Sequence, residues 1–344
     1  MINLSNKVKI SENHEPIIIA EISGNHAGSK KRFLQLIKSA CLNGADLIKI
    51  QTYEPEDITL NKSYGNFKIK KGIWKGKKLW DLYKKACTPF AWHNDAFKIA
   101  KKYNKILFSS PFSIRAVDFL EKFNCKLYKI ASFEITDYKL INYIASKKKP
   151  IIISTGMASL KEIRKAILII KKYHEKIIIL NCVSNYPTKL REINLERIKE
   201  LQRKFPKYFI GLSDHTNDIY SSIAALSFDI VVIEKHFNLK DKKETPDSTF
   251  SILPNQLLKL KEISKEIFLS RTNKLKKSNN QNKILRRSIF AIKNIKKGEK
   301  LNENNINTLR PSVGICASDY FKILKKKLKR DIKAGDPILK KDII

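Results

Sequence analysis

Eight short runs of mostly β-branched residues recur along the chain, and they constrain its fold more than any other feature of the sequence. Amphipathic segments such as Lys30–Leu42, Leu160–Tyr173 and Asn217–Leu226 lie between them. The runs are Ile17–Ala20, Leu47–Ile50, Ile106–Ser109, Leu127–Ile130, Ile151–Ser154, Ile177–Leu180, Phe209–Gly211 and Val231–Glu234. Strands that alternate with helices form parallel sheets, and eight such units in roughly 250 residues are typical of a closed (β/α)8 barrel. We therefore predict an α/β fold of the TIM-barrel class.

A doubly wound open sheet is the alternative fold, but no Gly-x-Gly-x-x-Gly motif follows the first run to support it. The runs are unevenly spaced, because about 55 residues separate the second from the third. An insertion is therefore expected at residues 52–92. Long connections at the rim of a barrel usually shape a pocket or a lid, so this insertion is expected to border the functional site.

Near residue 270 the alternating strand and helix patterns give way to a polar segment. Residues 271–283 read RTNKLKKSNNQNK, which has one apolar residue in thirteen and cannot bury a face. Beyond them, residues 294–306 (NIKKGEKLNENNI) nearly repeat at residues 331–343 (DIKAGDPILKKDI), which indicates two similar turn units in a small, mostly β domain. We predict a barrel domain at 1–270, a linker at 271–283 and the β-rich domain at 284–344.

Charge and composition argue against several classes of protein. The net charge is +36, but lysine is spread over nearly every predicted helix, and the densest cluster, at residues 325–330, has no interleaved aromatic residues. No specific nucleic-acid partner is expected. The apolar runs are far shorter than the roughly 20 residues of a membrane span, and the N-terminus lacks the apolar centre of a secretory signal. A cytoplasmic protein without a membrane partner is expected. The five cysteines form no Cys-x-x-Cys pair, which argues against disulfides or a zinc knuckle.

Polar residues follow nearly every run, at the end of a barrel strand where catalytic groups gather. Lys49 and Lys129 lie in the otherwise apolar strings LIKIQ and LYKIAS, so their amines are expected to reach the barrel mouth and an anion. Two lysines among serine hydroxyls suit a site for phosphate and carboxylate groups. The other polar residues at these positions are Glu21, Gln51, Ser109, Ser110, Ser132, Thr155, Ser184, Tyr186, Ser213, His215, Glu234 and His236.

His215 and His236 follow the last two runs, which are neighbours in the predicted barrel. A single histidine is more often structural than a metal ligand, but two at adjacent strand ends can converge on one cation. Two imidazoles with open coordination positions suit a divalent ion that acts as a Lewis acid. We expect Mn²⁺, with Mg²⁺ or Co²⁺ as alternatives.

Nine strings of the sequence resemble the sialic acid synthase family, in the right order and over essentially the whole chain. They are IIIAEISGNHAGS, LIKIQTY, FSSPF, YKIASFE, IISTGMAS, NCVSNYPT, GLSDHT, IEKHF and TPDSTFS. The C-terminal string RPSVGI resembles the antifreeze-like (SAF) domain that this family carries. The resemblance implies a (β/α)8 barrel followed by a SAF domain. It also implies a domain-swapped homodimer in which each small domain covers the barrel of its partner.

The resemblance also implies roles for single residues. His215 and His236 would hold the metal, and Glu21 or Glu234 would be the general base. The residues implied to bind phosphoenolpyruvate are Lys49, Ser110, Lys129, Ser132, Ser184 and Ser213. Those implied to face the sugar and the reacting centre are Glu21, Gln51, Tyr186, Glu234, Asp247 and Arg310. Ser110 and Ser184 depart from the Thr and Asn of family members that use N-acetylmannosamine, although both keep a hydrogen-bonding group.

The implied reaction condenses phosphoenolpyruvate with a six-carbon amino sugar and releases phosphate by cleavage of its C–O bond. The string KKGIWKGKKLWDLYKKACTPFAWH at residues 70–93 resembles the pseudaminic acid branch of the family, whose sugar is 2,4-diacetamido-2,4,6-trideoxy-L-altrose. Some of its aromatic residues are expected to form an apolar wall for the methyl group of that sugar, and most to pack the insertion on the barrel. They are Trp74, Trp80, Tyr83, Phe90 and Trp92. The alternatives are an N-acetylneuraminate or legionaminate synthase that uses another amino sugar, and a sugar-binding protein of the same fold without catalysis.

Overall fold

The computed structural model describes residues 1–70, 74–241, 243–272 and 280–344 and divides into two compact units, Met1–Thr272 and Asn273–Ile344. In the first unit, eight parallel strands close into a barrel in the order β10-β3-β4-β5-β6-β7-β8-β9. The strands are β3 (Ile17–Glu21), β4 (Leu47–Thr52), β5 (Ile106–Pro111), β6 (Tyr128–Ile130), β7 (Ile151–Ser154), β8 (Ile177–Cys182), β9 (Phe209–Asp214) and β10 (Val232–His236). Every predicted run forms one of these strands. The TIM-barrel prediction is confirmed, and the open sheet is wrong.

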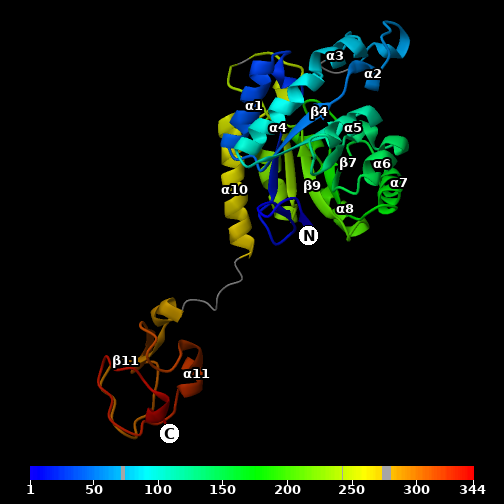
Figure 1. Cartoon of the computed structure of the whole chain (residues 1–344). Coiled ribbons are helices and arrows are strands. Elements are labelled where there is room, and N and C mark those ends of the chain that lie inside the picture. Colours follow the sequence, from blue (N-terminus) through cyan, green and yellow to red (C-terminus); the bar gives the residue numbers. More distant parts are fainter. Residues whose placement is uncertain (71–73, 242, 273–279) are drawn as a thin grey trace. The chain divides into compact units, whose positions relative to one another are not determined.

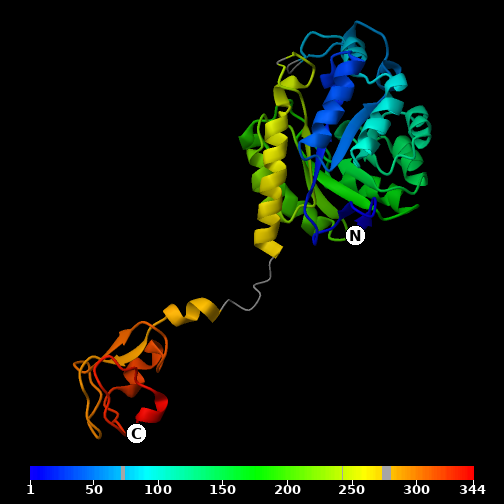
Figure 2. The ribbon, with the colours of Figure 1, turned by 60° about the vertical axis from the view of Figure 1, so that its left-hand side comes forward.

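Helices surround the barrel, and Figures 1 and 2 show α1 and α10 along its outer wall. They begin where the sequence provides caps. Ser29 accepts from the Arg32 N–H at the start of α1, and Ser159 forms a capping box with Glu162 at the start of α7. The helices of this unit are α1 (Lys30–Leu42), α2 (Pro55–Ile58), α3 (Leu79–Ala86), α4 (His93–Lys102), α5 (Ile114–Glu121), α6 (Tyr138–Ser146), α7 (Leu160–Lys171), α8 (Glu196–Lys204), α9 (Tyr220–Ala225) and α10 (Pro254–Thr272).

The long connection between β4 and β5 contains α2 and α3, which lie at one end of the barrel in Figure 1. Residues 71–73 of the predicted insertion lie outside the described residues. The N-terminus lies at the opposite end of the barrel, where β1 (Ile2–Asn3) pairs with β2 (Lys9–Ile10). The insertion therefore lies at the end where the strands finish and where functional side chains are expected.

The barrel interior is closely packed. A Cβ on Gly211 of β9 would come within 2.5 Å of the Val232 carbonyl oxygen and 2.6 Å of Leu180 Cδ2, so glycine is required there. The amino halves of the strands carry buried isoleucine and leucine, such as Ile152 and Ile178, whereas polar residues fill their carboxyl ends. Within the described residues, no helix is both long and apolar enough to cross a bilayer.

The second unit contains β11 (Ser288–Ala291), β12 (Ile306–Leu309) and α11 (Tyr320–Ile323) around a small core of isoleucine and leucine. Its two repeats pair with each other, because Ile295 and Ile332 exchange backbone hydrogen bonds at 2.9 Å. Gly298 and Gly335 occupy matching turns with φ of 82° and 92°, a conformation that favours glycine. This arrangement explains the sequence repeat.

The predicted linker, residues 271–283, is described only at its ends. Residues 271 and 272 complete α10, residues 280–285 form a short 3-10 helix, and residues 273–279 lie outside the described residues.

Candidate active site

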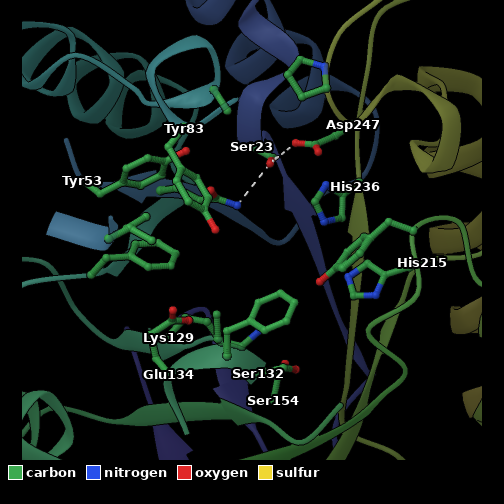
Figure 3. A pocket seen from close by; sticks show the side chains of 18 of the residues that line it. Ser23, Tyr53, Tyr83, Lys129, Ser132, Glu134, Ser154, His215, His236 and Asp247 are labelled. Atoms are coloured by element: carbon green, nitrogen blue, oxygen red, sulfur yellow. Dashed lines mark hydrogen bonds between the residues drawn. The ribbon is translucent and has the colours of Figure 1, made fainter. Parts of the chain in front are cut away.

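A pocket of about 370 Å³ opens where the barrel strands end. Figure 3 shows Lys129, Ser132, Glu134 and Ser154 on one side of it. The polar side chains that line the pocket are Ser23, Lys49, Gln51, Lys129, Ser132, Glu134, Ser154, Cys182, Ser213, His215, Glu234, His236 and Asp247. Its apolar and aromatic lining comes from Tyr53, Ile58, Ile69, Trp74, Leu79, Leu82, Tyr83, Ala86, Phe112, Ala131, Phe133, Tyr186 and Pro246. The pocket thus joins a polar floor of strand ends to an apolar wall that comes largely from the insertion.

The two predicted lysines converge on one carboxylate. Lys49 Nζ donates to Glu234 Oε1 at 3.0 Å, and Lys129 Nζ donates to both oxygens of Glu234 at 2.9 and 3.0 Å. Lys49 Nζ also forms an ion pair with Glu21 Oε2 at 3.1 Å, and Ser213 Oγ donates to Glu234 Oε1 at 3.2 Å. All four charged side chains are buried, which is tolerable because each has an opposite charge in contact. These contacts place four predicted catalytic residues in one cluster.

The cluster separates the proton affinities of its two glutamates. Burial raises the pKa of Glu21 to about 7, because the opposing effect of Lys49 is smaller. Burial also disfavours the charge of Glu234, but Lys129 and Lys49 outweigh it and hold the pKa of that carboxyl well below its usual range. Glu234 is therefore an anion at neutral pH, whereas Glu21 can exchange a proton there.

The cluster also separates the pKa values of its two lysines. Burial lowers the pKa of Lys129 to about 8 despite the attraction of Glu234. Burial acts on Lys49 as well, but Glu21 and Glu234 together outweigh it and raise the pKa of Lys49. Lys49 is therefore a permanent cation, and the charge of Lys129 depends more on what lies in the pocket.

The two predicted metal ligands lie together, with ring centroids 5.3 Å apart (Figure 3). His215 Nδ1 is 2.9 Å from the Val183 carbonyl oxygen, which can only accept, so Nδ1 carries a proton and Nε2 is the nitrogen that could bind a metal in the neutral ring. Burial opposes the charge of His215, but Cys182 outweighs it and raises the pKa of His215, so metal binding would have to displace a proton from Nε2. His236 is buried and its Nδ1 has no hydrogen-bond partner in the described part of the chain. Burial holds its pKa well below the usual range, so the imidazole is neutral, as a metal ligand must be.

These two histidines fit a divalent cation with open coordination positions. Among the residues that the structure describes, no group of three or more histidine, cysteine, aspartate or glutamate side chains is arranged to hold a metal. The protein would therefore supply two nitrogen ligands, and water and substrate would supply the rest. That geometry suits a catalytic cation and not a closed structural site.

The predicted phosphate-binding serines fall into two groups. Ser132 and Ser213 line the pocket, and Ser132 Oγ accepts from the Gly156 N–H at 3.1 Å. The hydroxyls of Ser110 and Ser184 are buried without a hydrogen-bond partner among the described residues and lie outside the pocket lining. A Cβ on Gly156 would come within 2.0 Å of Ser184 Oγ and 2.9 Å of Ser132 Oγ, so glycine lets these two serines approach each other.

Four of the six residues predicted to face the sugar line the pocket, namely Gln51, Tyr186, Glu234 and Asp247, whereas Glu21 is fully buried outside that lining. Asp247 Oδ2 accepts from Ser23 Oγ and from the Gly24 N–H, and Gln51 Nε2 donates to Glu21 Oε1 at 3.0 Å. The Tyr186 ring lies 4.5 Å from His215 and 5.7 Å from Trp74, centroid to centroid. Arg310, the last of the six, follows β12 in the second unit and is exposed, so its role stays a prediction.

Several lining residues were not predicted from the sequence. Ser154 and Cys182 end β7 and β8, so the rule that selected the other strand ends could have found them. Glu134 lies within the string YKIASFE, and burial raises its pKa to about 7. Tyr53 lies across the pocket from the two histidines in Figure 3, and no local pattern marks it. Tyr83, one of the aromatic residues named in the predicted insertion, packs against Tyr53 with 6.1 Å between ring centroids.

Comparison with known proteins extends these observations. A model of the NeuB family matches residues 36–276, and a model of the SAF domain matches residues 286–344. The chain belongs to the NeuB family. The predicted membership in the sialic acid synthase family, its enzymatic nature and its barrel with a SAF domain are thereby confirmed.

Two curated relatives of this NeuB-family chain are synthases. A pseudaminic acid synthase of Campylobacter jejuni is 40% identical over 329 residues, which cover 94% of this chain and 96% of the relative. An N,N'-diacetyllegionaminic acid synthase of the same species is 34% identical over 330 residues, which cover 94% and 98%.

A solved structure shows the same architecture. An N-acetylneuraminic acid synthetase of Leptospira borgpetersenii, crystallised with citrate, matches with a TM-score of 0.72 and 29% identity over 81% of this chain and 94% of that one.

Proposed function

We propose that this enzyme condenses phosphoenolpyruvate with 2,4-diacetamido-2,4,6-trideoxy-L-altrose and water to give pseudaminic acid and phosphate. The observation that carries the proposal is the cluster of Lys49, Lys129 and Glu234 beside His215 and His236 in one pocket. The higher identity to the pseudaminic acid synthase than to the legionaminic acid synthase favours this sugar.

The reaction balances as follows. C3 of phosphoenolpyruvate forms a bond to the aldehyde carbon of the open-chain sugar, and an oxocarbenium ion develops at C2. Water adds at C2 and gives up a proton, while the former aldehyde oxygen takes up a proton and becomes a hydroxyl. The new C2 hydroxyl then loses its proton and becomes a carbonyl as the bond between C2 and the phosphate oxygen breaks, so that phosphate leaves with that proton. A divalent cation at His215 and His236, Mn²⁺ by preference and otherwise Mg²⁺ or Co²⁺, would polarise the aldehyde oxygen.

Lys49 and Lys129 stabilise the carboxylate and phosphate of phosphoenolpyruvate, since both amines already lie together in a site of low dielectric. Ser132 and Ser213 line the same pocket and could turn their hydroxyls to the anion, whereas the hydroxyls of Ser110 and Ser184 are buried outside the pocket lining. In the free enzyme, Lys49 and Lys129 both form ion pairs with Glu234. A bound anionic substrate would then contact the same two lysine side chains as Glu234.

Glu21 is the better general base for the attacking water. Its pKa of about 7 lets it accept and return a proton at neutral pH, whereas Glu234 is held as an anion by two lysines. Glu234 would then position Lys49 and Lys129 and stabilise the positive charge that develops at C2. We propose this division of roles for the two glutamates that the sequence left as alternatives.

The apolar wall supports a sugar with a methyl group at C6. Trp74 and Tyr83 of the insertion line the pocket with Leu79 and Leu82. Phe90 packs on Phe119 with 4.5 Å between ring centroids, so it stabilises the insertion and not the pocket. Trp92 similarly packs against Phe33 and His26, and Trp80 lies outside the pocket lining.

The test compares kcat/KM for the trideoxy diacetamido sugar with that for N-acetylmannosamine, with the same phosphoenolpyruvate and Mn²⁺, by phosphate release. A preference of at least about tenfold for the first sugar is expected, because its methyl group is buried where the second has a hydroxyl. A preference for N-acetylmannosamine or for the legionaminic acid precursor would assign the chain to that branch. Absence of phosphate release with every sugar would favour a sugar-binding protein.

We also propose a domain-swapped homodimer in the cytoplasm, in which Arg310 reaches the pocket of the partner. A guanidinium offers a planar pair of donors to a sugar acyl group. Mixing Arg310→Ala chains with Lys49→Ala chains should restore part of the activity through hybrid dimers. No recovery after verified subunit exchange would contradict the swap.

A further inference from the structure

Ser23 adopts a backbone conformation that its side chain disfavours. It lies two residues beyond the end of β3 and has φ of 47°, in the left-handed region where residues other than glycine are strained. The residue is buried and lines the pocket. Such strain persists only where surrounding contacts hold it, so the contacts of this serine indicate why it is kept.

The Ser23 hydroxyl joins two pocket residues from opposite ends of the barrel domain's sequence. It donates to Asp247 Oδ2 and accepts from Gln51 Nε2 at 3.1 Å, as the dashed lines in Figure 3 show. The Gly24 N–H donates to the same Asp247 oxygen at 3.1 Å. A Cβ on Gly24 would lie 3.0 Å from Ala86 Cβ, so the turn is also packed tightly against α3.

These bonds decide which atoms remain for a ligand. The two N–H groups of the Gln51 amide are used by Ser23 and Glu21, so its carbonyl oxygen alone remains to bind a ligand. Asp247 Oδ2 receives two donors, which leaves Oδ1 as the second free acceptor. Ser23 thus holds two acceptors in the pocket, the Gln51 carbonyl oxygen and Asp247 Oδ1. Its own hydroxyl proton is used in the hydrogen bond to Asp247 Oδ2.

We propose that Ser23 is a positioning and specificity-determining residue, which sets Gln51 and Asp247 as a pair of acceptors for the N–H donors of a diacetamido sugar. This inference rests on the proposed function. A sugar with two acetamido groups presents two such N–H donors, whereas N-acetylmannosamine presents one N–H and, at C4, a hydroxyl in place of the second acetamido group. That hydroxyl can also donate, so an acceptor pair placed for two acetamido N–H groups discriminates by the geometry of the second donor and not by its absence.

Three variants test the proposal: Ser23→Gly, Ser23→Ala and Ser23→Thr. Glycine removes the hydroxyl and relaxes the backbone, alanine removes the hydroxyl and keeps the strain, and threonine keeps the hydroxyl. The measurements are KM and kcat for both sugars, KM for phosphoenolpyruvate, and the melting temperature.

The glycine and alanine variants should both lose roughly ten- to hundredfold in kcat/KM for the diacetamido sugar, mainly through KM. Their loss with N-acetylmannosamine should be smaller by about tenfold, and KM for phosphoenolpyruvate should stay within about twofold of wild type. Threonine should recover part of the preference. Ser23→Gly should melt above Ser23→Ala by roughly 2–4 °C because it is unstrained at positive φ.

Two results would overturn the inference. One is a Ser23→Gly enzyme with the wild-type preference between the two sugars. The other is equal losses for both sugars and for phosphoenolpyruvate, which would indicate a purely structural serine. A wild-type enzyme that turns over neither sugar would instead refute the proposed function, and this inference with it.

Discussion

The two ends of the same eight strands differ sharply in what they bury. At the amino ends, residues such as Ile18, Leu47 and Ile178 are buried among other apolar side chains. At the carboxyl ends the buried residues are polar, and several of their atoms have no hydrogen-bond partner within the described residues. These atoms are Ser110 Oγ, Ser154 Oγ, Ser184 Oγ and His236 Nδ1.

The difference shows how one barrel divides stability and chemistry. Burying a polar group without a partner costs free energy, so the carboxyl ends weaken the fold that the amino ends stabilise. Unpartnered buried donors and acceptors are also what an anionic substrate or a cation can satisfy. Substitutions at the two ends should therefore have opposite effects on stability and activity.

The largest expected effect is at the histidine pair. His215→Ala and His236→Ala should each lower kcat/KM by at least roughly a thousandfold, because the aldehyde oxygen loses its electrophilic partner. Far-UV circular dichroism should show an intact fold, and Mn²⁺ binding followed by electron paramagnetic resonance should be lost. His174→Ala, which precedes β8 at the amino end, is the matched control. Full activity of either pocket variant in chelator-treated buffer would refute the metal site.

A substitution in the lysine cluster should lower both the stability and the activity of the enzyme. Lys129→Met leaves buried Glu234 with one cationic partner in place of two, which should lower the free energy of unfolding by about 3–5 kcal/mol and abolish phosphate release. Adding Glu234→Gln should restore most of the stability and none of the activity. Urea denaturation and the phosphate assay measure the two quantities. A double variant as unstable as the single one would show that the ion pair is not the cause.

The amino ends should show stability effects alone. Ile178→Ala removes a fully buried side chain from the same strand that ends in Cys182, and it should cost about 3 kcal/mol in free energy of unfolding. Well below the melting temperature, kcat and both KM values should stay within about twofold of wild type. A selective loss of activity in this variant would contradict the division between the two ends.

Glu134 provides a pH-dependent effect at the carboxyl ends. Burial raises its pKa from 4.5 to about 7, so the folded state binds this proton more tightly than the unfolded state does. Its contribution to stability is therefore present below pH 4.5 and is lost as the pH rises through about 7. Between pH 5 and 8 the wild type should lose on the order of 2 kcal/mol that Glu134→Gln keeps. The exposed Glu262→Gln is the control, and parallel stability curves for Glu134→Gln and wild type would contradict the shift.

The smallest expected effect is a gain in stability. Ser154→Ala removes a buried hydroxyl that has no partner in the described chain, so stability should rise by up to about 1 kcal/mol. The KM for phosphoenolpyruvate should rise at the same time if the hydroxyl serves the substrate. Lower stability in this variant would show that the hydroxyl is satisfied in the folded enzyme.

Local sequence signals predicted the elements well and their ends less well. The helix expected at Asn217–Leu226 begins only at Tyr220, because Lys235 Nζ bonds the carbonyl oxygens of Thr216 and Asp218 at 2.7 Å and holds that segment as a turn. Most strands run one to three residues further than their apolar runs, since their last residues are the polar ones of the pocket. Both differences lie where a side chain from a distant part of the chain decides the local structure.

Apolar periodicity and capping act over a few residues, so the eight strands, the helices between them and the polar strand ends could be predicted from local sequence. Which polar groups meet depends on how distant segments pack. Closure of the barrel pairs β10 with β3, and this brings Glu234 to Lys49 and Lys129, which lie 185 and 105 residues away in the chain. The same closure buries Glu21 and raises its pKa while two lysines hold that of Glu234 low. Proton affinity depends on burial and on neighbouring charges in space, and the linear sequence specifies neither.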